Sequence, residues 1–290
     1  TVCTCSTVAS ACGSSAMAID DKHDMLLGKH TPVVDTYAPH LLYPISRSGG
    51  RETLDPADPV PFLGADLWHA YELSWLDDSG KPVVRVGRFI VPASSPNIVE
   101  SKSFKLYLNS LNSTAFASDE EARQTIVRDI SAVAGAGVSL QLLDPVDPCL
   151  SGARLAGTCI DDLPLLCRDE QPSADLLRQA GNEIIEEQLH SHLLRSLCPV
   201  TGQPDWASLW VHYRGVALDH RALLRYIIAY RRHQEFHEQC VERIFMDVLQ
   251  QCAPEFLQLQ AFFTRRGGMD ISPLRSTVPA CGSLPRTYRQ

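Results

Sequence analysis

The sequence predicts an α+β protein made of two tandem modules, each an antiparallel sheet with a pair of helices on one face. Three observations lead to this prediction. The order hairpin, helix, helix, strand occurs twice along the chain, and the apolar residues of each segment recur with the period that its secondary structure requires. The 290 residues are 44% hydrophobic and 21% charged, a composition typical of folded globular proteins.

The chain divides into four parts. Residues 1–24 are small, polar and aperiodic, and we expect them to be a disordered leader. Residues 25–143 form the N-terminal module, which begins with an irregular arm rich in Pro, Gly, Ser and Asp. A connector rich in Pro and Asp follows at 144–171, and residues 172–290 form the C-terminal module, which carries the candidate nucleophile described below.

The N-terminal module opens with two extended segments rich in Trp, Tyr, Val and Ile, joined by a turn of Asp, Ser, Gly and Lys. Two helical patterns follow; Ser118 is a suitable start for the second helix and Gly135 a suitable stop. In order, the predicted elements are a hairpin of residues 67–76 and 83–91, helices at 103–111 and 120–134, and a returning strand at 138–143.

The C-terminal module repeats this order after the connector. The predicted elements are a second long hairpin of residues 186–197 and 206–213, helices at 219–231 and 235–251, and a final extended segment at 255–264. Pockets often form where structural units meet, so we expect the functional site between the modules.

Charge and cysteine content restrict the class of function. A formal net charge of −8 argues against general binding to a nucleic-acid backbone, although a local basic pocket for one phosphorylated cofactor remains compatible with it. No segment approaches the roughly 18 to 20 apolar residues that span a bilayer, so we predict no membrane partner and no signal peptide. The ten cysteines include no C-x-x-C pair, a pattern that favours reduced thiols in the cytoplasm and disfavours a zinc ribbon.

Cys198 is the first candidate for chemistry. It lies in a turn rich in Pro and Gly, seven residues before Asp205. An accessible thiolate is a nucleophile, and a nearby carboxyl group can give a proton to the atom that gains charge after the attack. The alternative is a small, half-buried and inert cysteine.

The junction of the two C-terminal helices is the second candidate. Phe236 could stack on a heterocycle while Glu238 accepts hydrogen bonds from its N–H groups. A solvated helix start is the alternative. A metal site is another, because His233, His237 and Cys240 share a helix face.

Two basic clusters complete the set. Residues 99–107 place two lysines and two serines at the start of the first helix, where free backbone amides favour a phosphate. Arg265 and Arg266 precede two glycines, and glycine lets a backbone approach a ligand closely. Each cluster taken alone is equally compatible with a solvated surface.

These four segments together resemble the NADPH-dependent 7-cyano-7-deazaguanine reductases, the nitrile reductases of queuosine biosynthesis. Glu100–Tyr107 is similar to the segment that separates this family from the GTP cyclohydrolase I enzymes, and Cys198–Trp206 to its nucleophile and proton-donor segment. Glu235–Gln239 and Arg265–Gly268 match its patterns as well. The resemblance runs from about Leu27 to Pro273 and points to the longer, two-module form with the tunnelling fold (T-fold), in which modules associate around a central barrel.

The resemblance implies reduction of 7-cyano-7-deazaguanine to 7-aminomethyl-7-deazaguanine with NADPH, in the biosynthesis of a modified tRNA base. Cys198 would add to the nitrile carbon to give a thioimide. Asp205 would protonate the nitrile nitrogen, which near neutral pH requires that burial or a neighbour raise its pKa. His237 is a candidate proton source for the later steps.

The resemblance also implies the binding residues. The substrate would be held by Val99, Glu100, Ser101, Phe236, His237 and Glu238, and NADPH by Lys102, Ser103, Arg266 and Gly267. We predict no metal cofactor, no direct nucleic-acid partner and a homodimer. A Rossmann G-x-G-x-x-G motif is absent from the sequence, so the cofactor assignment rests on the resemblance.

Two other functions remain open at this point. A hydrolase of the cyclohydrolase type would use zinc and water on a purine and would need a Cys/His ligand set. A non-enzymatic purine-binding module would make Cys198 incidental.

Overall fold

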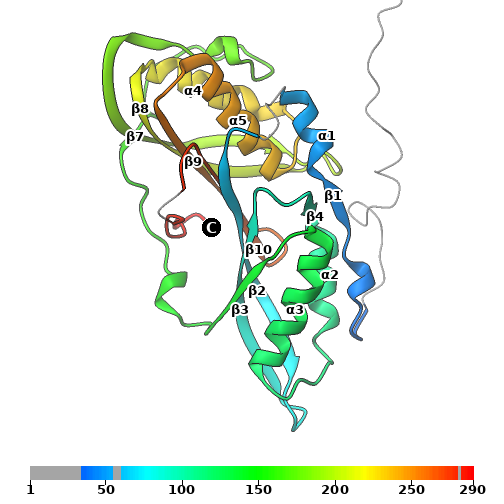
Figure 1. Ribbon diagram of the computed structural model, residues 1–290. Helices are drawn as coiled ribbons and strands as arrows, with labels where there is room; N and C mark the ends of the chain where they lie inside the picture. Colours follow the sequence, from blue (N-terminus) through cyan, green and yellow to red (C-terminus); the bar gives the residue numbers. More distant parts are fainter. Residues whose placement is uncertain (1–33, 55–59, 280–281) are drawn as a thin grey trace, which may run out of the picture.

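The computed structural model describes residues 34–54, 60–279 and 282–290. Figure 1 shows an elongated molecule in which the α2–α3 pair lies at one end and the α4–α5 pair at the other. The disordered leader expected at 1–24 lies outside the described residues. Within the described ranges, no helix has the length and apolar character needed to cross a membrane.

The N-terminal half has the predicted elements, and its hairpin is longer than predicted. Its elements are β2 (Leu63–Leu76), β3 (Pro82–Pro92), β4 (Asn97–Val99), α2 (Ser101–Ser110), α3 (Asp119–Ala134) and β5 (Ser139–Leu143). The side chain of Ser118 accepts a hydrogen bond from the Glu121 amide at the start of α3, and Gly135 ends the helix with a φ of 71°. Both predicted helix boundaries are therefore confirmed.

The C-terminal half contains two strands more than predicted, β6 and β10. Its elements are β6 (Thr158–Cys159), β7 (Gln179–Leu197), β8 (Pro204–Leu218), α4 (His220–Ala229), α5 (His237–Cys252), β9 (Phe256–Phe263) and β10 (Met269–Ser276). No strand was predicted at the position of β10, and Pro273 within the segment weakens its strand pattern. The ladder between β10 and β9 begins only after this proline, at Leu274.

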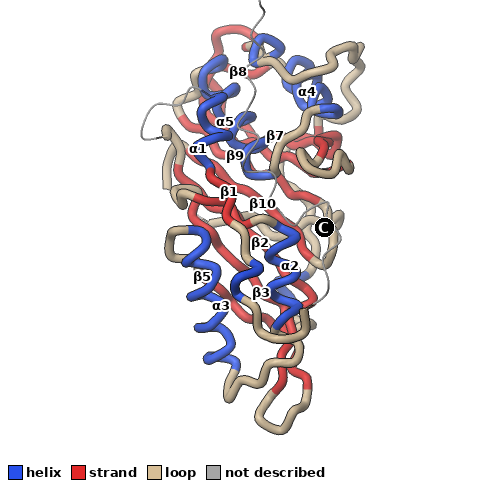
Figure 2. The backbone as a smooth tube through the Cα atoms, turned by 90° about the vertical axis from the view of Figure 1, so that its right-hand side faces the viewer, coloured by secondary structure: helices blue, strands red, loops and turns tan. Residues whose placement is uncertain are grey.

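One eight-stranded sheet joins the two halves, in the order β5-β3-β2-β10-β9-β8-β7-β6, and β10 pairs with β2 along its whole length. The pairs are antiparallel except for β6 with β7. Leu259 of β9 faces the α4–α5 pair, and Arg275 is its partner in the ladder with β10, so Arg275 lies on the same face of the sheet. Side chains two positions apart on a strand share a face, so Met269 and Ile271 of β10 also lie there, where they pack with α2 and α3. Both helical pairs therefore cover one face of the sheet (Figure 2). The predicted α+β class is confirmed. The two modules share one sheet, and the predicted end of the N-terminal module at residue 143 stays a prediction.

The arm expected to be irregular contains short regular elements, namely η1 (Pro39–Leu41), β1 (Pro44–Ser46), α1 (Arg47–Arg51) and η2 (Glu52–Leu54). Strand β1 pairs with β4, and Arg51 of α1 donates to Glu242 of α5 over 2.8 Å. Figure 1 shows the arm running from the α2 side of the molecule to α5. The arm thus ties the two halves together beside the sheet.

The remaining short elements are the 3₁₀ turns η3 (Pro148–Leu150), η4 (Ala174–Leu176) and η5 (Tyr230–Arg232). The first of the two predicted C-terminal helices ends earlier than predicted, because its last turn is the 3₁₀ turn η5 rather than α-helix.

Candidate active site

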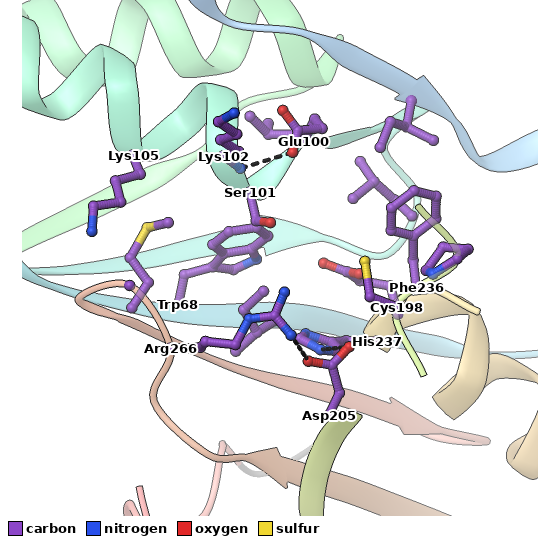
Figure 3. A pocket seen from close by; sticks show the side chains of 18 of the residues that line it. Trp68, Glu100, Ser101, Lys102, Lys105, Cys198, Asp205, Phe236, His237 and Arg266 are labelled. Carbon is purple, nitrogen blue, oxygen red and sulfur yellow. Dashed lines mark hydrogen bonds and ion pairs between the residues drawn. The ribbon is translucent and has the colours of Figure 1, made fainter. Parts of the chain in front are cut away.

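A cavity of about 200 Å³ lies on the helical face where the two halves meet. Its walls come from the start of α2, the turn between β7 and β8, the start of α5 and the turn between β9 and β10 (Figure 3). Of the twelve predicted site residues, these eleven line it: Val99, Glu100, Ser101, Lys102, Cys198, Asp205, Phe236, His237, Glu238, Arg266 and Gly267.

Ser103 is the predicted site residue that does not line this cavity. Its side chain is fully buried, and its hydroxyl donates to the Glu100 carbonyl over 2.7 Å and accepts from the Tyr43 amide over 3.0 Å. The structure therefore places Ser103 as a residue that attaches the arm to α2, and its role toward the cofactor has no geometric support.

Cys198 lies in the turn that closes the β7–β8 hairpin. The hairpin register pairs Leu197 with Pro204, and the Cys198 amide donates to the Gln203 carbonyl over 2.9 Å. Cys198 is only 5% exposed, so it is less accessible to solvent than its position in a turn suggested. In Figure 3 its sulfur lies beside Phe236 at the cavity wall.

Backbone hydrogen bonds bring the start of α5 to this turn. The Leu197 amide donates to the His233 carbonyl over 2.8 Å, and the Glu235 amide donates to the Leu197 carbonyl over 3.3 Å. These bonds hold segment 233–235 as a short extra strand against the end of β7. Cys198 and Phe236 therefore become neighbours although 38 positions separate them in the sequence (236 − 198).

Asp205 is enclosed, being 8% exposed, and has two charged partners. Arg266 Nη1 lies 2.6 Å from its Oδ1, and His237 Nε2 lies 3.3 Å from its Oδ2. Burial acts to raise the pKa of Asp205, but the hydrogen bond and charge of His237 and the charge of Arg266 outweigh it, so the pKa is below the ordinary value. The expectation of a raised pKa is therefore wrong for the protein without substrate.

Glu238 is a buried carboxyl group with one unsatisfied oxygen. It is 2% exposed, and its Oε1 has no hydrogen-bond partner among the described residues. Burial, together with the negative charge of Asp66, raises its pKa to about 7. An acceptor of this kind inside a cavity wall is suited to a ligand that brings N–H donors.

Glu100 precedes α2 and caps it. Its carboxylate accepts hydrogen bonds from the amides of Lys102 and Ser103, each over 2.8 Å. It is 1% exposed, and burial raises its pKa. Its oxygens are thus already used by the helix start, which makes it a more constrained acceptor than Glu238.

Cationic groups line the cavity, with Lys102 and Lys105 on α2 and Arg266 in the β9–β10 turn. That turn needs its two glycines, since Gly267 and Gly268 have φ values of 60° and 77°. A Cβ atom at Gly268 would also lie 2.6 Å from Glu72 Oε1. Three cations and a turn of small residues fit a ligand that carries phosphates, as the cofactor assignment requires.

Several lining residues were not predicted. Trp68 of β2, Met269 and Ile271 of β10, and Ile45 of the arm line the cavity with apolar surface. The signal for Trp68 was its position on the buried face of a predicted strand. Nothing in the sequence indicated Ile45, because only the pairing of β1 with β4 places the arm there.

The metal set suggested by helical spacing does not form. His237 Nε2 faces Asp205, His233 Nε2 lies 2.9 Å from Glu235 Oε2, and Cys240 is fully buried. In the described part of the chain, the one group of three within coordinating distance is Cys159, His190 and His192, away from this cavity.

Comparison with known proteins identifies the family to which the chain is similar. Residues 33–142 match the family described as nitrile reductase, 7-cyano-7-deazaguanine-reductase N-term, and residues 204–279 match the family described as QueF-like protein. The chain is 51% identical over 261 residues to the NADPH-dependent 7-cyano-7-deazaguanine reductase of Dechloromonas aromatica (strain RCB), covering 89% of this chain and 92% of that protein.

A solved structure, the archaeosine synthase QueF-Like in the apo form, matches with a TM-score of 0.30 and 16% identity. The match covers 34% of this chain and 99% of that one. At this score the likeness does not establish a shared fold.

Proposed function

The chain belongs to the NADPH-dependent 7-cyano-7-deazaguanine reductase family, and we propose that it carries out the reaction for which that family is named. It is an oxidoreductase that reduces the nitrile of 7-cyano-7-deazaguanine to the aminomethyl group of 7-aminomethyl-7-deazaguanine, in queuosine biosynthesis. The observation that supports the chemistry best is that Cys198, Asp205 and Glu238 line one cavity. They supply a nucleophile, a proton-holding group and an acceptor for ring N–H groups.

Cys198 is proposed as the covalent catalyst. Its sulfur adds to the nitrile carbon, one C–N π bond breaks, and the nitrogen takes up a proton, which gives a thioimide. This addition converts a resistant triple bond into a C=N bond. The low exposure of Cys198 keeps water from the adduct, since water would hydrolyse it.

The proton is proposed to come from the pair of Asp205 and His237 rather than from Asp205 alone. A carboxyl group whose pKa is below its ordinary value is ionised at neutral pH and has no proton to give. A protonated His237, held 3.3 Å from Asp205 and stacked on Phe263 at 3.9 Å, can carry the proton and deliver it. Asp205 then orients the His237 ring through this contact.

Substrate recognition is proposed for Glu238, Glu100 and Phe236. The unsatisfied Oε1 of Glu238 accepts from a ring N–H or amino group, and binding such a donor favours the ionised carboxylate. Phe236 lies at the cavity wall and stacks on the ring. Val99 and Ser101 complete the wall beside Glu100.

NADPH is proposed to be held by Lys102, Arg266 and Gly267, with Lys105 as a further cation. Each NADPH would supply one hydride when bound, so the four-electron reduction requires two NADPH molecules in succession. Between the two reductions Cys198 leaves as a thiolate, and the enclosed cavity retains the imine.

Trapping the covalent adduct tests this proposal. The protein is mixed with 7-cyano-7-deazaguanine without NADPH and its intact mass is measured. Wild type is expected to gain the mass of the substrate at Cys198, whereas Cys198→Ala gains nothing. An adduct on another cysteine, or nitrile-driven NADPH oxidation by Cys198→Ala, would overturn the assignment, and activity that depends on added zinc would favour a cyclohydrolase-type enzyme.

Localisation and assembly are part of the proposal. The six described cysteines Cys149, Cys159, Cys167, Cys198, Cys240 and Cys252 are free thiols, which supports the cytoplasm as the compartment. A homodimer and the absence of a direct nucleic-acid partner stay predictions. Light scattering of the purified protein, with and without tRNA, tests both.

A further inference from the structure

A group of potential metal ligands lies on the sheet face opposite the helices. Leu189 of β7 packs in the core with α4 and α5, so its neighbour His190 points to the other face. Strand β6 runs parallel to β7 and pairs Cys159 with His190. His192 follows two positions later on β7, and its ring lies 5.3 Å from the His190 ring.

The three side chains are close enough to share one ion. One ligand atom each from Cys159, His190 and His192 lies within 4.8 Å of the other two. One thiolate and two imidazoles form a ligand set that Zn²⁺ binds well, and tetrahedral zinc accepts three protein ligands plus a water. Cys159 is exposed and both histidines are half-buried, so an ion can reach them.

Hydrogen bonds orient both imidazoles for coordination through Nε2. His190 Nδ1 lies 3.2 Å from the Ala156 carbonyl oxygen, which can only accept, so the ring proton is on Nδ1. The lone pair of Nε2 is therefore free to bind a metal ion. His192 Nδ1 lies 2.7 Å from the buried hydroxyl of Ser208. The carbonyl contact fixes the tautomer of His190, and the hydroxyl contact orients the His192 ring.

The surrounding groups hold the ligands in place. Asp161 accepts hydrogen bonds from the Ser191 hydroxyl over 2.6 Å and from the His192 amide over 3.0 Å. Its negative charge beside the group favours a cation. Arg289 also lines the adjoining surface cavity of about 470 Å³, but it donates to the His192 carbonyl over 2.7 Å and its guanidinium lies over Trp206.

We propose that Cys159, His190 and His192 bind one Zn²⁺ ion that fastens the connector to the edge of the sheet. The fourth position is taken by water, and the thiol proton of Cys159 is released to solvent when the ion binds. Only two residue pairs join β6 to β7, so a cross-link between Cys159 and β7 restrains a segment that the sheet holds weakly. None of the three ligands lines the cavity of Cys198, so the ion takes no part in nitrile reduction.

Metal titration of the full chain tests the proposal. Chelator-treated protein is titrated with ZnCl₂ by calorimetry, and with CoCl₂ to record the thiolate-to-cobalt charge-transfer band. Wild type is expected to bind one equivalent. Cys159→Ser, His190→Gln and His192→Gln each weaken zinc binding about 100-fold or more, and Cys159→Ser removes the band.

Cys167→Ser is the matched control, because it removes another exposed thiol of the same connector and should bind zinc like wild type. Nitrile-driven NADPH oxidation by each variant shows that it has folded. Zinc should also protect residues 144–171 from limited proteolysis in wild type but not in Cys159→Ser. Unchanged affinity in the three ligand variants, no binding by wild type, or loss of zinc in Cys198→Ala would each overturn the proposal.

Discussion

The long helices of the two halves, α3 and α5, both carry a glutamate at their second position, and the two carboxyl groups have opposite environments. Glu120 in α3 is exposed, and hydrogen bonds from Arg123 and Gln124 lower its pKa to about 2. Glu238 in α5 is buried, and burial with the charge of Asp66 raises its pKa to about 7. The same residue at the same place stabilises a helix start in one half and faces a ligand cavity in the other.

The hairpin turns differ in the same way. In the turn of residues 77–81, Asp77 accepts from the amides of Ser79 and Lys81 and is partly exposed. At the other hairpin, Asp205 follows the turn as the second residue of β8 and is buried between Arg266 and His237. Repetition of the module therefore reproduces the fold, whereas the chemistry arises where segments distant in the sequence bury a hairpin end or a helix start.

The largest loss of activity is expected from a substitution in the β7–β8 turn, with a substitution in the turn of residues 77–81 as its control. Cys198→Ala should lower nitrile-driven NADPH oxidation by about four orders of magnitude or more, because no other group can form the thioimide. Ser79→Ala in the other turn should leave it unchanged. A steady-state assay of both variants checks this, and comparable losses in the two would mean that the halves do not differ as described.

Asp205→Asn should lower turnover by roughly two to three orders of magnitude. The amide does not pair with His237 and Arg266 as the carboxylate does, so the proton donor is no longer held in place and the addition reverses. Asp77→Asn is the control in the corresponding turn and should behave like wild type. Adduct formation by mass spectrometry is decisive, because an Asp205→Asn protein that labels as well as wild type would remove Asp205 from the proton path.

Glu238→Gln should weaken substrate binding about 10-fold, through loss of a charged acceptor. The measurement is made in the Cys198→Ala background by calorimetry, so that covalent chemistry does not contribute. The affinity of the parent should rise as pH increases through about 7, where Glu238 ionises, and the Gln protein should show no such rise. Glu120→Gln should match the parent at every pH.

The stability of the two glutamate variants should differ in sign and in pH range. The folded-state pKa of Glu238 lies above its unfolded value of 4.5, so its contribution to stability is lost as pH rises toward 7. Glu238→Gln should therefore raise the melting temperature at pH 8 by roughly 2 °C or more, with no gain at pH 5. For Glu120 the folded-state pKa is lower, so its small contribution is present above 4.5 and is lost as pH falls toward 2.

The smallest effect is expected from metal removal. Dialysis against a chelator should leave the rate of NADPH oxidation unchanged within about 10%, because thioimide reduction at Cys198 needs no Lewis acid. A loss of rate that added zinc restores would mean that a metal takes part in catalysis.

The order of elements and most of the site could be predicted from local sequence. Apolar periodicity identified both hairpins and all four long helices, because side-chain burial repeats every two residues in strands and about every 3.6 residues in helices. The motifs around Cys198, Phe236 and Arg266 identified the cavity walls, because each motif places its reactive groups within a few residues.

What only the tertiary structure decided depends on residues far apart in the chain. The pairing of β10 with β2 joins residue 270 to residue 69 and makes one sheet of two modules, and no local period encodes that choice. The low pKa of Asp205 and the high pKa of Glu238 were also beyond the sequence. A pKa is set by burial and by neighbouring groups. For Asp205 these groups are His237 and Arg266, 32 and 61 positions away (237 − 205 and 266 − 205), and for Glu238 it is Asp66, 172 positions away (238 − 66).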